Sequence, residues 1–74
     1  MRGIMKIYGY ENEDSELISL QEISLQVTID ELKELSTFID NTINMMEKYG
    51  DKFGHEHFSD FIKSKKYPDI IITK

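Results

Sequence analysis

One amphipathic segment constrains the fold of this chain more than any other feature. Thr28-Ile29-Asp30-Glu31 matches a capping box, in which Thr28 caps a helix and Glu31 reaches back to the Thr28 main-chain N–H. Gly50 is a common type of helix stop. Between these signals, apolar residues recur at the three- and four-residue spacing of a helix face: Ile29, Leu32, Leu35, Ile39, Ile43 and Met46. The pattern predicts a helix over residues 29–49.

A second group of apolar residues widens this stripe. When the helix is plotted at about 100° per residue, Phe38, Met45 and Tyr49 fall together on one flank of the stripe. The combined apolar arc is broader than one helix needs to cover one small sheet. Two interpretations stay open: these residues cover the edge of the sheet, or they form an exposed patch that binds another molecule.

The rest of the chain is typical of short strands. Residues 4–10 and 17–27 are rich in β-branched and aromatic side chains and flank a polar turn, which predicts an antiparallel hairpin. The second segment repeats Ile-Ser-Leu-Gln after five residues, an odd offset. Either a bend near Gln21 restores its apolar face, or both faces carry apolar surface. Residues 55–59 and 69–73 are two further candidate strands, and residues 55–62 are equally compatible with a short helix.

These elements predict a single α+β domain over residues 1–74. We expect a ββαββ order, with a mostly antiparallel sheet and one long helix packed on one of its faces. The alternative is ββαβ with a short extra helix. A chain of 74 residues has a marginal core, and without Cys it has no disulfide to support it. Association with itself or with a partner is the remaining source of extra stability.

The net charge of −5 is unevenly distributed, because residues 1–47 carry ten acidic side chains against three basic ones. Such a surface is repelled by nucleic acid and by anionic membranes; it suits a basic partner, or simply keeps a small protein soluble. No apolar run approaches the roughly 20 residues of a membrane span, and the first residues lack the apolar core of a signal peptide. We expect a cytoplasmic protein with neither nucleic acid nor membrane as its partner.

His55 and His57 are the residues most suited to site chemistry. On a strand, a His-x-His element points both imidazoles to one face, as in some metal sites. Two histidines fall short of the three or four ligands of a zinc site, so they are weak metal candidates; structural hydrogen bonds and partner recognition are the other interpretations. The sequence has neither a nucleophile signature nor a Gly-rich phosphate loop. We expect no catalytic activity, no metal and no cofactor.

The order of these elements resembles a known family. With Gly54-His55-Glu56-His57-Phe58 after the helix and Pro68-Asp69-Ile70-Ile71-Ile72 near the end, the chain is similar to immunity protein family thirty-two of bacterial polymorphic toxin systems. The resemblance implies a cytoplasmic, non-catalytic inhibitor that binds a cognate toxin and occludes its active surface.

An inhibitor of this kind needs apolar anchors and a charged rim. Phe38, Met45 and Tyr49 are the candidate anchors, and Asp40 and Glu47 are the candidate rim. His55 and His57 are further candidate contacts. The alternative function is a self-associating structural or regulatory module, a homodimer without a toxin partner.

Overall fold

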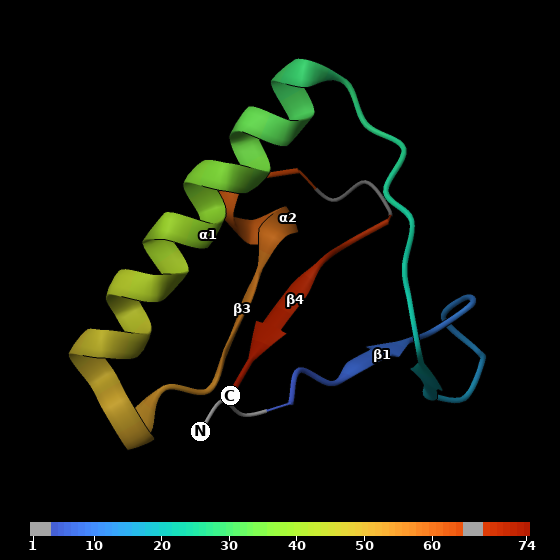
Figure 1. Cartoon of the computed structure of the whole chain (residues 1–74), viewed down its shortest axis with the longest axis horizontal. Coiled ribbons are helices and arrows are strands. Elements are labelled where there is room, and N and C mark those ends of the chain that lie inside the picture. Colours follow the sequence, from blue (N-terminus) through green and yellow to red (C-terminus); the bar gives the residue numbers. More distant parts are fainter. Residues whose placement is uncertain (1–3, 65–67) are drawn as a thin grey trace.

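The computed structural model of the chain describes residues 4–64 and 68–74 (Figure 1). It confirms the α+β class and the ββαββ order, with a short helix inserted between the last two strands. The elements, in chain order, are β1 (Ile7–Gly9), β2 (Ile18–Leu20), helix α1 (Ile29–Tyr49), the 3-10 turn η1 (Gly50–Lys52), β3 (His55–His57), helix α2 (Phe58–Phe61) and β4 (Ile71–Thr73).

The strands of the described residues form two separate two-stranded sheets, both antiparallel. β1 pairs with β2, with Ile7 opposite Leu20, and β3 pairs with β4, with His57 opposite Ile71. β2 is shorter than predicted, because the chain bends at Gln21 and then runs without ladder partners to Thr28. A bend at this point is one of the two outcomes that the odd spacing of the repeated Ile-Ser-Leu-Gln allows, since an unbroken strand would turn its second half to the opposite face.

Helix α1 begins and ends at local signals, at the residues where the sequence placed it. The Thr28 hydroxyl accepts the Glu31 N–H at 3.2 Å, and the Glu31 carboxylate accepts the Thr28 N–H at 2.8 Å. At the other end, the Gly50 N–H donates to the Met46 carbonyl, and Gly50 has a φ of 53°. Within the described residues, no helix is both long enough and apolar enough to span a membrane.

The core lies between α1 and the segment that runs from β3 to β4. Phe38 of α1 is fully buried, and its ring packs against those of Phe58 and Phe61 at centroid distances of 5.3 and 5.6 Å. Thr42 is also buried, and its hydroxyl donates to the Phe38 carbonyl at 2.8 Å. Leu35 and Phe53 complete the set of buried residues in the part of the chain that the structure describes. This core is small for 74 residues, as expected for a short chain without disulfides.

The N-terminal hairpin stands away from this core (Figure 1). The radius of gyration is 13.3 Å, whereas a compact domain of this length has about 11 Å. The accessible surface is 7126 Å², whereas a compact monomer of this mass exposes about 4,700 Å². The chain is therefore open, and it exposes about 2,400 Å² more than a compact fold would.

Candidate binding surface

Helix α1 is rotated relative to the expectation from its sequence. The buried side carries Leu35, Phe38 and Thr42, and Met45 and Met46 are half-buried. Four residues of the predicted core stripe instead face solvent: Ile29 at the start of the helix, which is 74% exposed, and three further along it, Leu32, Ile39 and Ile43, which are 53%, 41% and 47% exposed. We call these three residues the α1 outer flank. Of the flank for which two interpretations were open, the helix thus buries Phe38, half-buries Met45 and exposes Tyr49, and it exposes much of the stripe that was expected to be core.

The α1 outer flank has an acidic border. Asp40 precedes Ile43 by three residues and Glu47 follows it by four, so both lie beside Ile43 on the helix surface. Both carboxylates are exposed. The two residues predicted as a charged rim therefore lie beside apolar surface, although this surface is formed by Leu32, Ile39 and Ile43.

The three predicted anchors have different positions. Phe38 is 0% exposed and belongs to the core, where its ring contacts those of Phe58 and Phe61. The prediction that Phe38 is a docking residue was therefore wrong. Met45 is half-buried, and its sulfur lies 3.6 Å from the Asn41 side-chain amide. Tyr49 is exposed at the end of α1, where the Lys48 ammonium lies 5.4 Å from its ring centroid.

His55 and His57 share one face of β3, as their spacing predicted. Their rings are 5.1 Å apart and meet edge to face. His55 is exposed, whereas His57 is partly buried and its Nδ1 lies 2.8 Å from an Asp69 carboxylate oxygen. No group of three or more His, Cys, Asp or Glu that could hold a metal ion occurs in residues 4–64 and 68–74.

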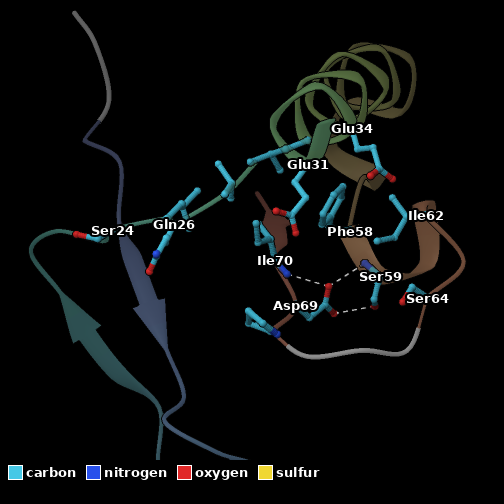
Figure 2. A pocket seen from close by; sticks show the side chains of 14 residues that line it. Ser24, Gln26, Glu31, Glu34, Phe58, Ser59, Ile62, Ser64, Asp69 and Ile70 are labelled. Carbon is cyan, nitrogen blue, oxygen red and sulfur yellow. Dashed lines mark hydrogen bonds between the residues drawn. The ribbon is translucent and has the colours of Figure 1, made fainter. Parts of the chain in front are cut away.

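Asp69 is a hydrogen-bond hub that joins the start of β4 to the junction of β3 and α2 (Figure 2). Besides His57, its carboxylate accepts the Ser59 N–H at 2.8 Å, the Ser59 hydroxyl at 3.0 Å and the Ile70 N–H at 2.8 Å. Burial raises the pKa of Asp69, but these hydrogen bonds together outweigh it, so the pKa lies below its ordinary value of 3.8. The carboxylate therefore stays ionised at neutral pH.

The combination of Ser59, His57 and Asp69 does not have the geometry of a catalytic triad. In a triad the imidazole lies between the carboxylate and the hydroxyl and takes the hydroxyl proton. Here the Ser59 hydroxyl and the His57 ring both contact the same oxygen, Oδ2 of Asp69. The hydroxyl proton is directed at the carboxylate, so this cluster holds local structure together.

A cleft of about 520 Å³ lies next to this hub. Residues 24–27, which follow the bend, form one wall, and the first half of α1, helix α2 and the start of β4 form the others (Figure 2). Two carboxylates of α1 lie at its edge. One belongs to Glu31, whose pKa is held below its ordinary value by the hydrogen bond from the Thr28 main chain; the other belongs to Glu34.

Comparisons with known protein families, with curated proteins and with solved structures find no match for this chain.

Proposed function

We propose that this protein is a non-catalytic binding domain, and that it neutralises a toxin by covering the toxin's active surface. The α1 outer flank carries the proposal: it is a run of apolar side chains on a rigid helix with exposed carboxylates beside it. Apolar residues of this kind, with a polar rim, are typical of protein docking sites. The choice of a toxin as partner follows from the resemblance to the immunity family.

The open shape of the chain supports a role completed by a partner. An excess of about 2,400 Å² over a compact monomer exceeds the roughly 800 Å² that each partner buries in a standard protein complex. Covering part of this surface would add the apolar burial that a core of three large side chains lacks.

Charge supports a basic partner. Asp40 and Glu47 border Ile43, and the net charge is −5. Carboxylates at the rim of an interface speed the encounter with a basic protein more than they tighten the complex. We therefore expect the association rate to fall as salt is added, while the dissociation rate changes little.

The experiment uses the cognate toxin, which the resemblance to the immunity family implies is the C-terminal domain of a large secreted protein encoded beside this chain. Ile39→Glu and Ile43→Glu should each weaken its binding by about tenfold or more, because each places a charge in a surface that must become dry. Leu17→Glu is the matched control: Leu17 is exposed to a similar extent but lies before β2, so this variant should bind like the unmodified chain. All three variants should stay folded at the temperature of the binding measurement, because each replaced side chain is about half exposed and its loss lowers the thermal midpoint by less than the loss of a buried one. Equal binding by all four proteins would refute the α1 outer flank as the docking surface.

Self-association is the second candidate, because the same exposed surface also suits a second copy of the chain. The measurement is sedimentation of the isolated protein at micromolar concentration. A tight dimer that Ile43→Glu dissociates would support this candidate. A monomer across that range would remove it and leave the toxin proposal in place.

A further inference from the structure

The segment after β2 has the pattern of a strand but no strand partner. Ile23, Leu25 and Val27 alternate with Ser24 and Gln26, which is the period of a half-buried strand. All three apolar side chains are exposed. Among the described residues, no main-chain hydrogen bond involves residues 22–27. Their N–H and C=O groups are therefore free to pair with another chain.

β4 offers a second unpaired edge. In the described residues it pairs with β3 alone, so its other side carries no ladder. Residues 68–70, which lead into β4, and residues 24–27 line the same cleft, on different walls (Figure 2). The cleft is thus bordered by one strand-like segment without a strand partner and by the residues that lead into a second unpaired edge. An unpaired strand edge is a template for the addition of another strand.

The lining of the cleft indicates what kind of strand would fit. Its apolar surface is contributed by Leu25, Val27, Leu35, Phe58, Ile62 and Ile70. Its charged residues are all acidic within the described part of the chain: Glu31, Glu34 and Asp69. An extended peptide with apolar side chains on one face and basic side chains on the other would match both features.

We propose that this cleft binds an extended, basic segment of a partner protein, which adds a strand beside residues 22–27. The main-chain pairing supplies affinity, the apolar lining receives alternate side chains of the segment, and the carboxylates at the edge select lysine or arginine. A second copy of this chain fits less well, because its own strand-like segment, residues 22–27, carries Glu22 and no basic side chain. The site is separate from the α1 outer flank, so it goes beyond the proposed function.

The test uses an eight-residue synthetic peptide in which valine alternates with lysine, and a valine–glutamate peptide as its control. The valine–lysine peptide should slow amide hydrogen exchange at residues 22–27 by tenfold or more when the cleft is saturated. The control peptide should leave exchange unchanged. Glu34→Lys should weaken binding of the valine–lysine peptide by about two- to fivefold, the effect of one exposed charge pair.

Three outcomes would overturn the proposal: no binding at millimolar peptide, equal binding of both peptides, or protection confined to the α1 outer flank. Protection of residues 22–27 that grows with protein concentration in the absence of peptide would overturn it in favour of a second copy. Circular dichroism shows whether Glu34→Lys keeps α1 folded. Leu25→Lys changes the opposite wall of the cleft, and it should also weaken binding of the valine–lysine peptide. Failure here leaves the toxin proposal standing, because that proposal is tested through Ile39 and Ile43.

Discussion

Truncation of Phe38 to alanine should remove a large share of the stability of this protein. Phe38 is completely buried, and truncation of a buried phenylalanine costs about 3–5 kcal/mol. Its tilted contacts with the Phe58 and Phe61 rings are part of what is lost. A domain of this length has a total free energy of unfolding of about 4–11 kcal/mol. Phe38→Ala should therefore lower the thermal midpoint by more than about 10 °C.

Ile39→Ala is the matched control, because Ile39 is the next residue on the same helix and is 41% exposed. It loses only part of its burial, and alanine favours the helix, so the expected cost is about 1 kcal/mol or less. Chemical denaturation followed by circular dichroism gives both free energies of unfolding, provided that the slopes of the transitions agree.

The comparison decides which flank of α1 faces the core. A cost below about 1 kcal/mol for Phe38→Ala, with a cost above about 2 kcal/mol for Ile39→Ala, would reverse the assignment. The helix would then bury the stripe that its sequence pattern favours. The docking surface proposed on Leu32, Ile39 and Ile43 would be lost with it.

Three further predictions concern the ends and joints of the elements. The pKa of Asp69 is lowered on folding, so the stability that the ionised carboxylate contributes is complete above the unfolded pKa of about 3.8 and is lost as the pH falls through the lower folded pKa. Asp69→Asn should therefore make the free energy of unfolding depend less on pH in that range. An unchanged dependence on pH would contradict the role of Asp69 as a hydrogen-bond hub. Thr28→Ala should lower the free energy of unfolding by about 1 kcal/mol through loss of the helix cap. Thr37→Ala, on the exposed middle of α1, should lower it by much less. Equal losses in urea denaturation would show that the cap does not stabilise the helix. Gly50→Ala should destabilise the protein by about 1–3 kcal/mol, because Gly50 has a φ of 53° that alanine rarely adopts. Gly54→Ala is the control, because the added methyl group has no other atom within 4 Å beyond its chain neighbours. Equal shifts of the two thermal midpoints would argue against backbone strain at Gly50.

The parts of the fold that the sequence predicted are those with local causes. The capping box at Thr28 and the stop at Gly50 each act within about one helical turn, so the bounds of α1 can be read from adjacent residues. The first hairpin follows from two β-rich segments around a polar turn, and its second strand ends at a bend, which was one of the two outcomes that the shifted apolar pattern allowed. The residues after Gly50 carried no period long enough to separate strand from helix, and they form both in turn.

The candidate surface was predicted less well, because the apolar residues of α1 occupy about half of the helix circumference. An apolar arc this broad does not indicate which of its sides faces the core. The His57–Asp69 contact was also beyond the sequence, since the residues are twelve positions apart and their pairing depends on the register of β3 with β4. His-x-His was a visible signal, but nothing beside Asp69 marked it as the acceptor of four hydrogen bonds.

The amino-acid sequence alone determined the long helix, the order of strands around it and the acidic character of the chain, because these depend on neighbouring residues and on composition. Tertiary structure decided the rotation of α1, since the Phe38 ring finds Phe58 and Phe61 only when the C-terminal segment folds back against the helix. Packing those three rings together, with Phe38 buried, turned Leu32, Ile39 and Ile43 toward solvent. Contacts between distant residues therefore decided which side of the broad apolar arc is exposed, against the side that the helix pattern alone favoured as surface.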